Sequence, residues 1–117
     1  MNFVKIIPIK LYDTKLKFII SNDARKTINR IYKKHKTGMV YKDYIAGMFL
    51  TLSMNTYYII IDNRHLDHNT IQHEQFHCVM EITFDRCVYE EEQRAWLMGF
   101  IGQEIYNFIK EKGIKVG

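Results

Sequence analysis

Two histidines and a glutamate lie within five residues of one another in the second half of the chain, in the run His73-Glu74-Gln75-Phe76-His77. On a helix, residues i and i+4 share a face, so both imidazoles can reach one metal ion. Glu74 projects about 100° round the helix, which suits a base beside a metal-activated water better than a third ligand. The spacing predicts a catalytic zinc site with one ion per chain.

The residues on either side support a helix at this point. Tyr57–Ile61 is an aromatic and β-branched run that predicts a buried strand. Thr70–Ile82 contains no Gly or Pro and has helical apolar spacing. Asp67 or Asn69 can cap this helix by accepting its first free amide hydrogens. A short motif of this kind matches by chance in roughly one per cent of such chains. The predicted strand and helix around it are therefore needed to support the zinc site.

A catalytic zinc also needs a third protein ligand and an open position for water. Glu90–Glu92 begins a second predicted helix, where acidic residues also favour a helix start through the macrodipole. With helix ends near Ile82 and Val88, His77 lies about 8 Å from the first end and Glu92 about 6 Å from the second. Antiparallel packing would then put the two side chains level.

Small residues on the second helix, at Ala95, Gly99 and Gly102, predict a close approach to the histidine helix. Glu91 and Glu92 flank the centre of this stripe almost equally, so the angle round the helix leaves both open as the third ligand. Glu90 points away.

The histidine motif followed by Glu92-Gln93-Arg94-Ala95 resembles the gluzincin metallopeptidases, in particular small ImmA/IrrE-like and phage-encoded enzymes. The resemblance extends from about residue 46 to about residue 106. It implies that His73 and His77 are zinc ligands and that Glu74 is the general base. It also implies Glu92 as the third ligand, with Glu91 as the alternative. In such enzymes the strand before the motif, here Thr56–Ile61, resembles the edge that holds the substrate.

Other residues are weaker candidates. Two loop histidines and two tyrosines could stabilise an oxyanion, although exposed loop residues and core aromatics are the commoner outcomes; these are His65, His68, Tyr89 and Tyr106. Glu81 lies four residues after His77 and could orient a ligand. Cys78 points away from the histidine face and is interpreted as a buried thiol.

Length and composition predict a single domain over residues 1–117, since 47% apolar residues suffice for one core. We expect an α+β fold: a small antiparallel or mixed sheet with an N-terminal helix over Ala24–His35, then the motif helix and a C-terminal glutamate-bearing helix. Only two cysteines and no apolar run near 18 residues are present. These observations favour a cytoplasmic protein without a membrane partner.

Charge is divided unevenly along the chain. Residues 1–47 carry eleven Lys/Arg and three Asp/Glu, a net +8, whereas residues 48–117 carry six and ten, a net −4. Lys33, Lys34 and Lys36 could contact phosphates, but a solvated helix face explains them more simply. We therefore do not expect direct nucleic-acid binding. A DNA-associated protein substrate fits the charge equally well.

The sequence thus predicts zinc-dependent hydrolysis of peptide bonds in a protein or peptide substrate. One alternative is a catalytically silent, zinc-containing binding or inhibitor protein. Another is a basic nucleic-acid-binding module in which the motif is accidental. The intact Glu74 favours the enzyme, because a structural zinc site has no use for a base. The oligomeric state does not follow from the sequence.

Overall fold

Four runs rich in β-branched and aromatic residues form one mixed sheet in the computed structural model, which describes residues 2–117. The strands are β1 (Phe3–Ile9), β2 (Thr14–Ser21), β3 (Gly47–Ser53) and β4 (Thr56–Asp62). Their order across the sheet is β1-β2-β4-β3. β2 and β4 are parallel, and the other two pairs are antiparallel. The mixed sheet and the α+β class agree with the prediction.

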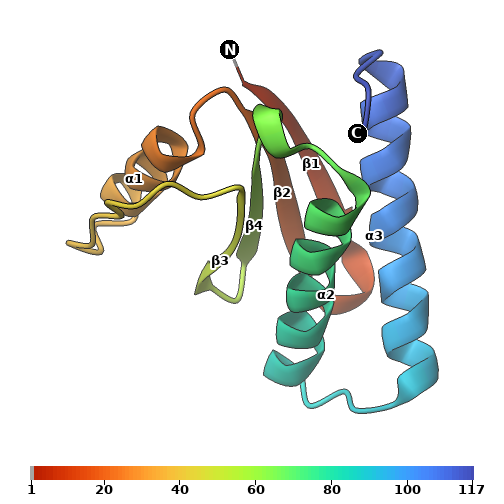
Figure 1. The fold of residues 1–117 in the computed structure, drawn as a ribbon. Coiled ribbons are helices and arrows are strands. Elements are labelled where there is room, and N and C mark those ends of the chain that lie inside the picture. The colour runs from red at the N-terminus through yellow and green to blue at the C-terminus, as the bar shows by residue number, and fades with distance from the viewer. Residues whose placement is uncertain (1) are drawn as a thin grey trace.

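Three α-helices cover the two faces of the sheet: α1 (Ala24–Lys34), α2 (His68–Asp85) and α3 (Glu91–Glu111). Figure 1 shows α1 on one face and α2 with α3 on the other. β1 and β2 precede α1, so the chain begins with strands and not with a helix. Within residues 2–117 no helix has the length and apolar character needed to cross a membrane.

β4 contributes to both hydrophobic cores of the protein. Tyr57, Ile59 and Ile61 belong to the core beneath α2 and α3, whereas Tyr58 and Ile60 belong to the core beneath α1. Side chains alternate between the two faces of a strand, so a strand buried on both faces reads as a continuous apolar run. This explains the unbroken apolar sequence of β4.

A hydrogen-bonded network fixes the C-terminal end of α2 to the sheet. The Tyr57 hydroxyl donates to the Asp85 carboxylate at 2.6 Å and accepts from Arg86 at 2.9 Å. Arg86 also donates to the Met54 carbonyl oxygen, in the turn between β3 and β4, at 2.9 Å. Burial and the bond to Asp85 raise the pKa of Tyr57 to about 12, so the hydroxyl stays protonated. The network therefore holds the motif helix in a defined position against β3 and β4.

Candidate metal centre

Helix α2 begins at a side-chain cap. The Asp67 carboxylate accepts a hydrogen bond from the Thr70 amide at 2.7 Å, so Asp67 is the cap and Asn69 lies inside the helix. One face of α2 is buried against the sheet through residues that include Ile71 and Ile82. The opposite face of the helix is exposed to solvent and carries the two histidines of the motif.

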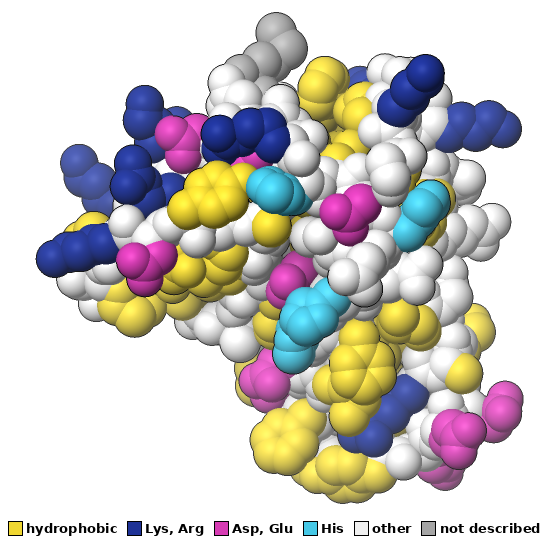
Figure 2. Space-filling model, in the orientation of Figure 1, with side chains coloured by type: hydrophobic (Ala, Val, Ile, Leu, Met, Phe, Trp, Pro, Cys, Tyr) yellow, Lys and Arg dark blue, Asp and Glu magenta, His cyan; other side chains and the backbone are white. Residues whose placement is uncertain are grey.

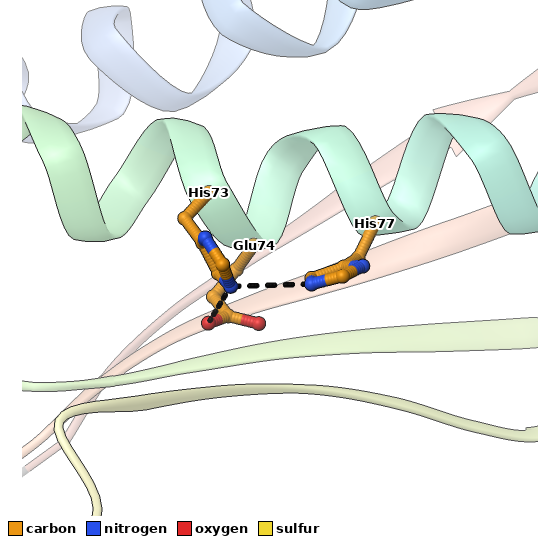
Figure 3. Close-up of side chains that lie close together, drawn as sticks. All are labelled: His73, Glu74 and His77. Atoms are coloured by element: carbon orange, nitrogen blue, oxygen red, sulfur yellow. Dashed lines mark hydrogen bonds and ion pairs between the residues drawn. The ribbon is translucent and has the colours of Figure 1, made fainter.

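His73 and His77 lie side by side on this exposed face, one turn apart (Figure 3). Their Nε2 atoms are 3.2 Å apart, and the ring planes are inclined at 79°. Two nitrogens bound to one tetrahedral zinc at 2.0–2.1 Å are separated by about 3.3 Å. The two imidazoles therefore already have the spacing of two zinc ligands.

Glu74 lies beneath the two imidazoles and points to the same side of α2 (Figure 3). Its residue is only 8% exposed, and its Oε2 atom is 4.0 Å from His73 Nε2. The candidate ligand atoms of His73, Glu74 and His77 all lie within 4.8 Å of one another. A carboxylate at this distance can share a water molecule with a metal held by the imidazoles, which is the position that a general base needs.

Gly47, the first residue of β3, lies directly against the motif helix. A Cβ atom at this position would be 2.9 Å from Thr70 Cγ2, 3.0 Å from Ile61 Cδ1 and 3.4 Å from Glu74 Cγ. The missing side chain therefore lets the strand approach the base closely. Sequence reasoning missed Gly47, although a glycine at the start of a strand is a known signal of close backbone approach.

The substrate-holding strand was assigned wrongly from the sequence. β4 pairs with β2 on one side and β3 on the other, so it has no free edge for another strand. β3 pairs only with β4 and forms that edge of the sheet. Phe49 of β3 and His77 of α2 line one hollow of about 260 Å³, so the free edge lies beside the histidines. The sequence could not reveal this because strand order depends on tertiary pairing.

The helix ends differ from the positions assumed when Glu92 was assigned. α2 continues to Asp85, and α3 begins only at Glu91. His77 is therefore about 12 Å from the end of its helix, whereas Glu92 is about 1.5 Å from the start of α3. The antiparallel contacts agree, because Gln75 donates to the Met98 carbonyl oxygen at 2.7 Å. Glu92 and His77 are thus offset by about 10 Å along the helices.

The two glutamates at the start of α3 lie at different angles round that helix. Leu97 and Ile101 are buried and define the inner face of α3. Glu92 lies roughly 140° to 180° round the helix from these residues, while Glu91 is nearer the inner face. Both glutamates are exposed, and within residues 2–117 the only cluster of side chains that could hold a metal ion comprises the three motif residues. The assignment of either glutamate as a ligand remains a prediction.

Only part of the small-residue stripe packs closely on α2. A Cβ on Gly102 would be 2.9 Å from Gln75 Nε2, so this glycine does allow close packing on α2. A Cβ on Gly99 would have nothing within 4 Å, and Ala95 is exposed. The predicted stripe is therefore wrong in its first half. The close approach between α3 and α2 occurs where Gly102 meets Gln75, and not beside His77.

The structure places the proposed oxyanion residues apart from the three motif side chains. His68 Nδ1 lies 3.0 Å from the Tyr106 hydroxyl, and the two rings stack. His65 packs edge-on against Tyr44, with ring centroids 5.5 Å apart. Tyr89 is exposed beyond the end of α2. None of these side chains belongs to the metal-binding group within residues 2–117.

Glu81 and Cys78 lie where the sequence analysis expected them. Glu81 lines the same hollow as His77, one turn further along α2. Cys78 is fully buried, and burial raises the pKa of its thiol above the ordinary value. A buried thiol facing the core cannot join the imidazoles as a ligand.

Lys and Arg side chains gather over α1 in the view of Figure 2. Burial, together with the nearby charges of Lys34 and Lys15, lowers the pKa of Lys17. His35 Nε2 is 2.9 Å from the Tyr58 hydroxyl, so this histidine is held in a structural contact. Within residues 2–117 only Arg64 among the lysines and arginines lies within 4.0 Å of a carboxylate.

The chain was compared with known proteins in three ways. No protein-family model, no curated protein and no solved structure matched it. The chemistry of the three motif side chains is therefore what points to a function.

Proposed function

We propose that this protein is a zinc-dependent peptidase of the gluzincin type that cleaves a protein or peptide substrate. The observation that carries this proposal is the arrangement of three side chains: two imidazole nitrogens 3.2 Å apart, with a buried carboxylate oxygen 4.0 Å from one of them. A structural zinc site normally fills its fourth position with Cys or His and has no base beside it. The motif helix instead exposes its histidines next to a free sheet edge.

Zinc held by His73 and His77 would supply Lewis-acid chemistry, because it lowers the pKa of a water and polarises the scissile carbonyl. Glu74 accepts a proton from the attacking water and returns it to the leaving amine. Gly47 keeps this carboxylate in place by allowing β3 to pack against it. The peptide bond breaks, water adds across it, and Glu74 ends the cycle unprotonated.

The third ligand is assigned to Glu92 by the family resemblance, with Glu91 as the alternative. Either assignment requires the first turn of α3 to move toward His77, because the two helices are offset in this structure. β3 offers the substrate an unpaired row of backbone groups along its free edge.

The decisive experiment compares wild type with Glu74→Gln for zinc content and for cleavage of a peptide library. The amide keeps the shape of the side chain but cannot accept the proton. We expect one zinc per chain in both proteins and cleavage by wild type alone. Turnover by Glu74→Gln would remove Glu74 from the role of base.

A catalytically silent zinc protein that binds or inhibits a partner is the second candidate. It is favoured by the separation of Glu91 and Glu92 from the histidines, which leaves the third ligand unassigned by geometry. Such a protein would hold one zinc and cleave nothing in the library. A chain with no zinc affinity would contradict both candidates and favour a protein in which the motif is accidental.

A further inference from the structure

A mainly apolar groove lies between α2 and α3, next to the hollow that His77 lines. Phe76 and Met80 of α2 and Met98 of α3 line a hollow of about 470 Å³. Met80 and Arg94 line both this hollow and the smaller one that contains His77. The two hollows therefore share lining residues, and the groove adjoins His77.

Arg94 is the one cationic side chain in the groove, and it is held in a fixed orientation. Its Nε donates to the Thr83 hydroxyl at 3.1 Å, and its guanidinium lies 5.7 Å from the centre of the Tyr89 ring. Thr83 is buried, and its hydroxyl donates to the Val79 carbonyl oxygen at 2.8 Å. Within residues 2–117 the two terminal amino groups of this guanidinium donate no hydrogen bond to the protein.

The positive charge of Arg94 has no counter-charge in contact with it. Within residues 2–117 no carboxylate lies within 4.0 Å of its guanidinium, although the side chain is half-buried among apolar neighbours. A guanidinium fork with free donors recognises a carboxylate through two parallel hydrogen bonds. The other lining residues are mainly apolar, with Glu91 in the larger hollow and Glu81 in the smaller one, and a charge that converges on apolar side chains is the usual design of a ligand site.

From this geometry we infer that the groove binds the carboxyl-terminal end of the substrate. Arg94 binds the terminal carboxylate, while Phe76, Met80 and Met98 enclose a large apolar side chain. This inference rests on the proposed peptidase function, and it makes the enzyme one that removes a short segment from the end of a chain. A side-chain carboxylate near the scissile bond offers the same chemistry, so the experiment must separate these two sources.

Glu91 also lines the larger hollow, one turn before Arg94 on α3. The negative charge of Glu91 repels a substrate carboxylate and competes with it for the Arg94 guanidinium. Glu91→Gln should therefore strengthen binding of a substrate carboxylate.

The test measures peptide binding to the zinc-loaded Glu74→Gln protein by calorimetry. The probes are the peptide Ala-Ala-Ala-Phe as a free acid, the same peptide as an amide, and the amide of Ala-Ala-Glu-Phe. We expect the free acid to bind at least roughly tenfold more tightly than the plain amide, as for a charge-assisted bidentate contact. The amide that carries Glu separates recognition of a side-chain carboxylate from recognition of the terminus.

Adding Arg94→Gln should bring the acid and the plain amide to nearly equal affinity, whereas Arg94→Lys should retain part of the difference. Equal affinity for acid and plain amide in the Arg94-containing protein would overturn the inference, as would preference for the Glu-containing amide over the acid. This comparison does not depend on the folding of any Arg94 variant. Wild type that lacks zinc or cleaves no peptide would contradict the peptidase function, whatever the acid-to-amide ratio in Glu74→Gln.

Discussion

Replacing Gly47 with alanine tests the contact between β3 and the motif helix. The added methyl would be 2.9 Å from Thr70 Cγ2 and 3.0 Å from Ile61 Cδ1. Favourable carbon–carbon contacts lie at about 3.5–4.0 Å, so the neighbours must move by about 0.5–1 Å. Ile61 can turn its terminal methyl away, but the β-branched Thr70 in a helix has few alternative rotamers.

Two opposing effects set the size of this change. Inserting a methyl group into a packed interface costs about 1–3 kcal/mol. Alanine also reduces the conformational freedom of the unfolded chain, which stabilises the folded state by about 0.4–1 kcal/mol. The steric cost is the larger effect, so we expect Gly47→Ala to lower the free energy of unfolding by about 0.5–2 kcal/mol.

Gly99→Ala provides the matched control. A Cβ there has nothing within 4 Å, and the residue lies inside α3. Alanine should stabilise this helix position by about 0.5–1 kcal/mol. Urea unfolding followed by circular dichroism measures both variants. If Gly47→Ala is as stable as wild type while Gly99→Ala is stabilised, β3 does not approach α2 as closely as the structure indicates.

The remaining predictions concern the candidate metal ligands and the ion pair between the buried Asp62 and the exposed Arg64. His73→Ala should abolish stoichiometric zinc binding measured by metal analysis, because too few ligands remain to hold the ion; retained zinc would refute the ligand assignment. Glu92→Ala should lose zinc while Glu91→Ala keeps it, and the reverse result would transfer the role to Glu91. Hydrogen bonds from Arg64 lower the pKa of Asp62 below its ordinary value of 3.8. The ionised Asp62 therefore stabilises the fold above that pH, and this contribution is lost as the pH falls through the lower folded-state pKa. Asp62→Asn should reduce the loss of unfolding free energy that wild type shows as the pH falls, measured by denaturant unfolding at several pH values. The same loss in both proteins would contradict this role of Asp62.

Local sequence signals explain several elements of the structure in physical terms. The cap by Asp67 depends only on a short carboxylate placed before a helical run. The hairpin between β3 and β4 follows from two apolar runs joined through Met54-Asn55. Pro8 lies in β1, an edge strand of the sheet, as its missing amide hydrogen requires. Each of these features is determined within a few residues of chain.

The errors arose where the position of one element depended on another. The free edge beside the site belongs to β3, because β4 pairs on both sides. The offset between His77 and Glu92 depends on where α2 ends, and the contacts of Asp85 and Arg86 with Tyr57 hold that end. No local pattern encodes these long-range contacts.

The sequence by itself determined that two imidazoles and a carboxylate meet on one turn of helix, because the helical period fixes their relation within five residues. It also determined the α+β class through its apolar periodicities. Tertiary structure alone decided that Gly47 lies against Glu74, that β3 is the free edge and that Arg94 faces the groove beside His77. These relations join residues far apart in the chain, and side-chain packing between separate elements sets them.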